Sequence, residues 1–176
     1  MNERLGEALR IISVAVDVQG AEAARPWLER AGATFLTVVD AGNDLGRALG
    51  YKVVPTGILV DEHGIVRHLQ AGGFEVDDEE TLGLVEAFAR GEVDEVAEAQ
   101  QGREDVAERL RIAHELLRHG KREEALVELD RALELDPDDF VVRKQRWAIR
   151  NPDRFYPAVD RDWQREQLVR ERPPAD

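Results

Sequence analysis

The sequence contains no cysteine, and this absence excludes several kinds of chemistry. Without a thiol, these residues can form no disulfide bond, no thiolate metal site and no thiol nucleophile. Long apolar runs are also missing, so we expect no membrane-spanning helix. The first ten residues, MNERLGEALR, are too polar for a secretory signal peptide. These features together predict a cytoplasmic protein.

Positive charge is scarce relative to negative charge. The 176 residues include 24 lysines and arginines against 37 aspartates and glutamates, a net charge of −13. Nucleic acids and anionic membrane surfaces repel such an acidic body, so we expect neither as a partner. The glycine turn AGG at 71–73 is not a phosphate-binding loop, and no motif indicates a cofactor. A protein or a peptide is the expected partner.

The first half of the chain alternates between strand and helix patterns. The run LRIISVAVDV is rich in β-branched residues and predicts a strand buried on both faces. The other predicted strands are TFLTVVD (34–40), TGILVD (56–61) and IVRHLQ (65–70), and the predicted helices cover 20–32, 43–50 and 77–91. Asn43 is the expected N-cap of the second helix. This order predicts an α/β layer over residues 1–91.

The second half is predicted to be helical. A charged stretch at 92–105 is expected to be a linker or a solvated helix. Two amphipathic helices follow it, separated at HGK and ended by DPDD, and a third covers 140–150. The predicted units are therefore 1–91, the linker 92–105, a helical region 106–150 and a C-terminal arm 151–176 that includes a candidate fourth helix.

The helical region resembles one tetratricopeptide-type repeat over residues 106–140. The matching positions are the small residues Ala113, Ala125 and Ala132, the turn residue Gly120, the groove residues Leu116 and Leu129, and Pro137 after the second helix. It departs from that family where Arg109 and Leu110 replace an aromatic residue. A single repeat needs a neighbour to cover it, and the helix 140–150 is the expected cap. The hairpin either completes a core or a dimer interface, or forms a peptide-binding groove.

A proline at the start of a strand carries the most specific signal. Pro55 cannot donate a ladder hydrogen bond, so it belongs at the first position of a strand or in a turn, and we expect a cis peptide bond before it. The segment YKVVPTGILVDEHGIVRHLQAGG resembles thioredoxin-like proteins, in particular the TlpA/ResA-type thiol–disulfide oxidoreductases and their peroxiredoxin relatives. The order of elements over residues 5–90 agrees. The resemblance implies that the backbone of Val54, Pro55 and Thr56 pairs with an extended peptide.

The chain departs from that family at its redox centre. The family carries a C-x-x-C pair at the end of a central strand, and that strand, its cysteines and the front of the following helix have no counterpart here. Three explanations are open: a degenerate module, a longer reading frame with an upstream cysteine or selenocysteine motif, and a second chain that supplies the missing part. The upstream coding sequence distinguishes the second hypothesis from the others.

The resemblance places the missing strand between IISVAVD and TGILVD. Those two strands must then pair directly or leave open edges, and open apolar edges associate. We therefore predict either self-association, with a homo-oligomer as the expected state, or a gap filled by another segment.

Further candidate residues have mostly structural interpretations. The histidines His63, His68, His114 and His119 lack zinc spacing, and we expect no metal site. The C-terminal arm combines aromatic residues with arginines, a mixture typical of interfaces. The candidate interface residues of the arm and of the helix before it are Trp147, Phe155, Tyr156 and Trp163. The arm is expected to wrap its own chain or a second subunit, and a binding surface for another protein is the alternative.

Two functions follow from these observations. The first is a truncated thioredoxin-like domain followed by a tetratricopeptide-like hairpin and a helical tail, without catalytic residues and acting as a protein-binding or assembly module. The second is part of a thiol–disulfide oxidoreductase or of a thiol-dependent antioxidant related to alkyl hydroperoxide reductases. Whether the protein is an enzyme depends on which of the two holds.

Overall fold

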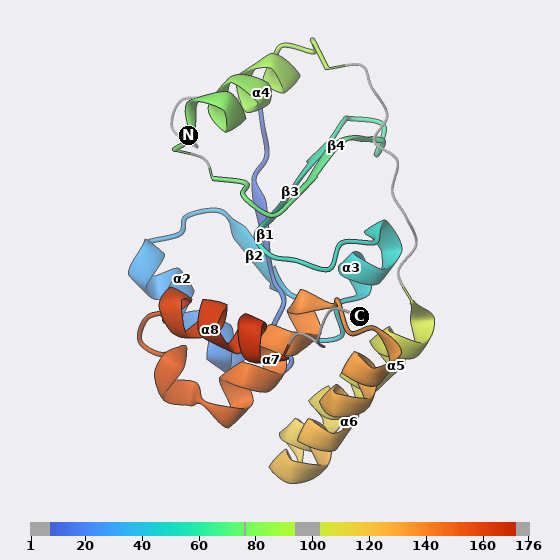
Figure 1. Cartoon of the computed structure of the whole chain (residues 1–176). Coiled ribbons are helices and arrows are strands. Elements are labelled where there is room, and N and C mark those ends of the chain that lie inside the picture. Colours follow the sequence, from blue (N-terminus) through green and yellow to red (C-terminus); the bar gives the residue numbers. More distant parts are fainter. Residues whose placement is uncertain (1–7, 76, 94–102, 172–176) are drawn as a thin grey trace.

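Strands and helices alternate in the first half of the molecule, and the second half is helical (Figure 1). The computed structural model describes residues 8–75, 77–93 and 103–171. In order, the elements are β1 (Ile12–Ala15), α2 (Ala21–Ala31), β2 (Leu36–Val39), α3 (Asp44–Leu49), β3 (Thr56–Val60), β4 (Val66–Ala71), α4 (Glu79–Ala89), α5 (Glu104–Arg118), α6 (Arg122–Leu135), α7 (Phe140–Arg150), the 3₁₀ turn η1 (Pro152–Arg154) and α8 (Arg161–Glu171). The predicted mixture of α/β and helical structure is confirmed, and the specific thioredoxin-like fold stays a prediction.

The described strands form two separate sheets. β1 and β2 are parallel, with Ile12 opposite Leu36, and β3 and β4 are antiparallel, with Thr56 opposite Ala71. No ladder joins β1 to β3 within the described residues. Of the two outcomes expected from the sequence, direct pairing of these strands does not occur, and each keeps an open edge.

The prediction that the first strand is buried on both faces is wrong. β1 covers only four residues, and Ile12 retains 52% of its exposed surface. A strand is buried on both faces only where a layer packs against each side of its sheet. Within the described part of the chain, the exposure of Ile12 therefore indicates that one side of β1 lacks such a layer.

Two helix starts test the predicted caps. Asn43 occupies the N-cap position of α3, but its backbone is left-handed (φ 53°) and its side chain makes no capping hydrogen bond. The Asp40 carboxylate caps instead, because it accepts from the backbone N–H groups of Asp44 at 2.8 Å and Leu45 at 2.9 Å. At α4, Asp78 accepts from the Thr81 N–H at 2.9 Å, as expected for an acidic helix start.

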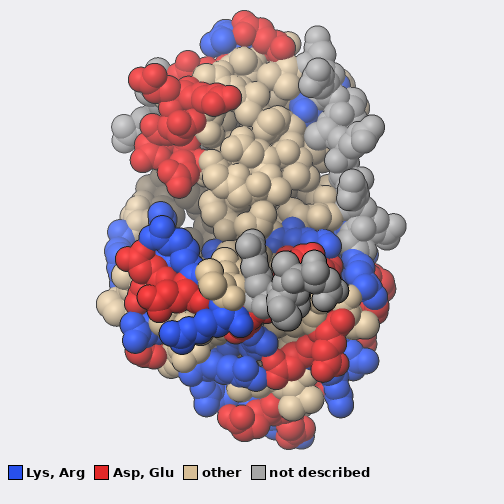
Figure 2. All heavy atoms as spheres, in the orientation of Figure 1, with Lys and Arg blue, Asp and Glu red and all other residues tan. Residues whose placement is uncertain are grey.

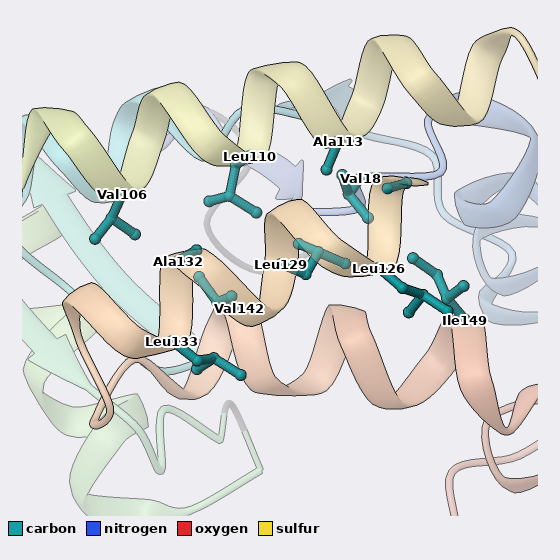
Figure 3. Close-up of a cluster of buried hydrophobic side chains, with 11 residues drawn as sticks. Val18, Val106, Leu110, Ala113, Leu126, Leu129, Ala132, Leu133, Val142 and Ile149 are labelled. Carbon is teal, nitrogen blue, oxygen red and sulfur yellow. The ribbon is translucent and has the colours of Figure 1, made fainter. Parts of the chain in front are cut away.

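The three helices α5, α6 and α7 enclose the larger buried cluster (Figure 3). The small residues Ala113, Ala125 and Ala132 are fully buried where α5 and α6 pack, which confirms the predicted close crossing. α7 covers the other side of α6 and contributes Val142 and Ile149. The predicted capping role of the third helix is therefore confirmed.

The helical half packs directly on the α/β half. Val18, which follows β1, is 1% exposed and belongs to the same buried cluster as the three helices. The first amides of α7 provide a second contact, because the N–H groups of Phe140 and Val141 donate to the Lys52 carbonyl at 2.9 and 3.1 Å. Among the described helices, none is both long and apolar enough to span a membrane.

Candidate protein-interaction site

The predicted peptide-binding loop begins with a cis peptide bond. The bond between Val54 and Pro55 is cis, as expected from the sequence. The Thr56 hydroxyl donates to the Val53 carbonyl at 2.6 Å, and the Pro55 carbonyl accepts from the Gly72 N–H at 2.9 Å. Pro55 itself is exposed, whereas Val54 and Thr56 are half-buried. The structure therefore places the three predicted residues together at the start of β3.

Helix α7 lies against this loop. The Lys144 ammonium donates to the Val54 carbonyl at 3.3 Å and also lies 4.9 Å from the centre of the Phe140 ring. Burial lowers the pKa of Lys144, and the positive charge of Arg161 lowers it further. The Val54 and Pro55 carbonyls thus each accept a hydrogen bond from within the chain.

The same helix holds the chain that leaves β1. The Gln145 side chain accepts from the Val18 N–H at 2.9 Å and donates to the Val16 carbonyl at 2.8 Å. From α5, Nδ1 of His114 lies 2.7 Å from the Val18 carbonyl oxygen. These contacts satisfy backbone groups at a position where no neighbouring strand pairs with the chain.

Among the residues that the structure describes, the edge of β1 opposite β2 carries unpaired backbone groups. The Ala15 carbonyl accepts from the Asp40 N–H at 2.9 Å, so Ala15 faces β2. Consecutive residues of a strand direct their N–H and C=O groups to opposite edges. Ile12, Val14 and Val16 therefore face the open edge, and within the described part of the chain only Val16 finds a partner there, in Gln145.

One face of the β1–β2 sheet is apolar and uncovered. Ile12 and Leu36 lie opposite each other and are 52% and 59% exposed, and Val38, the partner of Val14, is 42% exposed. Side chains two residues apart share a face, so these four residues form one apolar ladder. Contiguous exposed apolar residues of this kind are typical of interaction surfaces. We call Ile12, Val14, Leu36 and Val38 the β1–β2 ladder.

Charged groups are distributed unevenly over the surface. Figure 2 shows a broad area without charged residues over the upper half of the molecule, bordered by an acidic group at the N-terminal end of α4. Positive and negative side chains cover the helical lower half in alternation. An uncharged area in a chain of net charge −13 allows close approach of another polypeptide with little repulsion.

The aromatic residues predicted as an interface gather inside the chain instead. Trp147 and Phe155 are buried, at 2% and 8% exposure, and Trp163 packs against both, with ring centres 5.7 and 6.3 Å away. Tyr156 lies 5.9 Å from Trp27 of α2. The indole N–H of Trp147 donates to Glu171 at 2.8 Å. The C-terminal arm therefore wraps its own chain, which was one of the expected outcomes.

A cluster of charged residues lies where α7 begins. Lys52 forms an ion pair with Asp136 at 2.7 Å, and Asp139 caps α7 by accepting from the Val142 N–H at 2.9 Å. Burial, together with the negative charge of Asp136, raises the pKa of Asp139 to about 6. Tyr51 lines the same small cavity, and burial raises its pKa to about 12. This cluster joins the two halves of the molecule.

The described residues contain no cluster of histidine and carboxylate side chains that could hold a metal ion. The four histidines lie apart, His63 in the β3–β4 turn, His68 on β4, His114 on α5 and His119 at the end of α5. The sequence contains no cysteine for the redox reaction of the resembled family.

Comparison with protein-family models, with curated proteins and with solved structures gave no match.

Two residues that contact the candidate site were not predicted from the sequence. Lys144 and Gln145 have the polar character expected on the solvent side of a helix, and nothing in their spacing indicates a contact with β1 or with the Pro55 loop. A signal exists for Gln145, because it lies three residues after Val142 and four before Ile149, on the stripe that α7 buries. A polar residue on such a stripe has a partner when it is buried.

Proposed function

We propose that this chain is a thioredoxin-like protein-binding module that carries out no redox chemistry with its own residues. What supports the proposal most directly is the exposed β1–β2 ladder, which offers apolar side chains to solvent beside an unpaired strand edge. A surface of this kind lowers its free energy by binding another polypeptide. The partner is another protein or a second copy of this chain.

The absence of thiols supports binding over catalysis. The resembled family reacts through a thiolate, and this sequence has no residue that can form one. The carbonyl of Val54, which the resemblance assigns to peptide binding, accepts a hydrogen bond from Lys144. We therefore assign the primary binding surface to the β1–β2 ladder rather than to the Pro55 loop.

Site-specific photo-crosslinking tests the proposal. A photoreactive phenylalanine derivative at position 36 is expected to form one defined protein adduct in cells that express the chain, because Leu36 is 59% exposed and is the most exposed residue of the β1–β2 ladder. Position 169 is the matched control, since Val169 is an apolar residue of α8 with 75% exposure. The adduct should disappear when Val38→Lys is added to the position-36 variant.

Two results would overturn the proposal. One is the absence of any adduct at position 36, and the other is the same set of adducts at positions 36 and 169. Mass spectrometry of a specific adduct distinguishes a second copy of the chain from another protein.

The break between the two sheets favours a second candidate function. A strand with a reactive cysteine, supplied from outside this sequence, would pair there and complete a thiol–disulfide oxidoreductase or thiol-dependent antioxidant. The complex purified under mild conditions from its native cells should then reduce insulin disulfides, and alkylation of thiols should abolish the activity. An inactive complex would exclude this second function and leave the protein-binding module as the proposed function.

A further inference from the structure

We propose that the small cavity between α3, α5 and the start of α7 binds one ordered water molecule. The water hydrogen-bonds Asn43 and Arg47 of the α/β half to Asp139 of the helical half. This water site is separate from the β1–β2 ladder and independent of the proposed protein-binding function. It forms part of the junction between the two halves of the molecule.

Two buried polar atoms without a hydrogen-bond partner belong to residues that line this cavity. Asn43 is 5% exposed, and its side-chain oxygen Oδ1 accepts no hydrogen bond from the described residues. Nε of Arg47 is buried as well and donates to none of them. An unsatisfied buried polar group is costly, and most such groups in native proteins bind either the protein or an ordered water.

The local backbone fixes the Asn43 amide at the wall of the cavity. Residue 43 is left-handed (φ 53°), a conformation in which asparagine is enriched. Its amide packs over Gly46, where an added Cβ would lie 2.2 Å from Oδ1. Glycine at position 46 therefore makes the room that the Asn43 amide occupies.

The other contacts of Arg47 leave its Nε without a hydrogen bond. Its terminal nitrogen NH1 forms an ion pair with Glu104 at 3.1 Å. Nε lies 3.8 Å from Oδ1 of Asp44, which is too long for a hydrogen bond. A polar contact beyond about 3.5 Å leaves room for a bridging water.

The chemistry of the cavity wall identifies water as the occupant. Nε–H of Arg47 is a donor, whereas Oδ1 of Asn43 is an acceptor. The guanidinium repels a metal cation, and the carboxylates of Asp136 and Asp139 on the same wall repel an anion. Water is uncharged and both donates and accepts, so it satisfies the two atoms together.

The size of the cavity agrees with a single water molecule. Its volume is about 20 Å³, and one water needs about 10 to 15 Å³. A buried water typically makes about three hydrogen bonds. Asp139 provides the third partner, because its carboxylate has lone pairs beyond the one that accepts from the Val142 N–H. The water then connects α3 to the residue that caps α7.

A high-resolution crystal structure of the full-length chain tests the site directly. We expect an ordered solvent peak within about 3.2 Å of Asn43 Oδ1, Arg47 Nε and a carboxylate oxygen of Asp139. Soaking crystals in bromide distinguishes water from an anion, because bromide replaces a bound anion and scatters anomalously. A structure without a solvent peak between these three groups, or with a bromide peak there, would overturn the proposal.

A double-mutant cycle tests the water bridge in solution. Asn43→Gly keeps the left-handed backbone and removes the acceptor. Asp139→Ser keeps a capping residue for α7 and removes the carboxylate. Because both residues bind the same water, losing the second one costs less. The unfolding equilibrium constant of the double variant should therefore fall short of the product of the single effects by at least about threefold.

Asp78 provides the matched control for Asp139. It caps α4 in the same way, by accepting from the Thr81 N–H at 2.9 Å, so Asp78→Ser combined with Asn43→Gly should give the simple product of the single effects. Urea unfolding measures both cycles. A simple product in the Asp139 cycle as well would contradict the bridge. The crystallographic test uses the native chain and stands even where a variant fails to fold.

Discussion

At the scale of single residues, Asp139 is the group whose charge state matters most for the junction between the two halves. Its carboxyl is 6% exposed, caps α7 and lies near Asp136, so burial and repulsion raise its pKa to about 6. In the unfolded chain the pKa returns to 3.8. The folded state therefore binds the proton of the Asp139 carboxyl more tightly than the unfolded chain does. The stability that this proton contributes is present at low pH and is lost as pH rises through about 6.

Replacing the carboxylate by an amide should remove this pH dependence. Asparagine caps helices as well as aspartate does, so Asp139→Asn retains the start of α7. We expect the free energy of unfolding of Asp139→Asn minus that of the native chain to increase by about 2 to 3 kcal/mol between about pH 4 and pH 7. Urea unfolding at a series of pH values measures this difference. A difference that stays constant with pH would contradict the assigned pKa.

Gln145 is the second residue whose removal has a defined cost. Gln145→Ala leaves the N–H of Val18 without a partner in a residue that is 1% exposed. An unsatisfied buried backbone group costs about 1 to 3 kcal/mol, so we expect a loss of about 2 kcal/mol in the free energy of unfolding. Gln167→Ala, at a half-buried position of α8, is the control. A loss below about 0.5 kcal/mol for Gln145→Ala would refute this role.

At the scale of elements, α8 and the turn before it stabilise the helical half. Trp163 packs on Trp147 and Phe155, and Glu171 accepts hydrogen bonds from the Trp147 indole and from Arg143 at 2.8 and 2.6 Å. The arm therefore acts as a cover over α7.

Removing one aromatic residue of that cover should destabilise the fold. We expect Trp163→Ala to lower the free energy of unfolding by about 3 kcal/mol, because truncation of a packed aromatic residue leaves a cavity. Val169→Ala on the same helix, at 75% exposure, should change it by less than about 0.5 kcal/mol. Thermal or urea unfolding compares the two, and deletion of 151–176 should lower stability further. Equal stabilities of the two variants would show that α8 does not cover the core.

Most elements could be predicted from the sequence, because local signals define them. Gly32 ends α2 in a left-handed conformation, Pro55 directly precedes β3, and the third helix of the helical half begins and ends at the predicted residues 140 and 150. The exposure of β1 could not be predicted, because a β-branched run has the same pattern whether or not layers cover it. The Asp40 cap was missed because it lies four residues before the amide it binds.

The candidate site was predicted only in part. The cis-proline loop carries a sequence motif and lies where expected. The β1–β2 ladder depends on which strands fail to pair, and this depends on contacts between distant segments. Gln145 and Val18 are 127 positions apart, so no local pattern links them.

At the scale of the whole molecule, the two halves differ in how completely they are covered. The helical half encloses two buried clusters, whereas the strands described in the α/β half form two small sheets with open edges. A two-stranded sheet is marginally stable without further packing. The uncovered half is therefore the part of the molecule that gains most from a partner.

Sedimentation velocity of the isolated chain tests this central claim most directly. With no partner present, the β1–β2 ladder should drive concentration-dependent self-association. Leu36→Lys places a charge within the ladder and should yield a monomer, whereas Val169→Lys on α8 should associate like the native chain. A native chain that stays monomeric at every concentration, or a Leu36→Lys variant that associates as strongly as the native chain, would contradict the account.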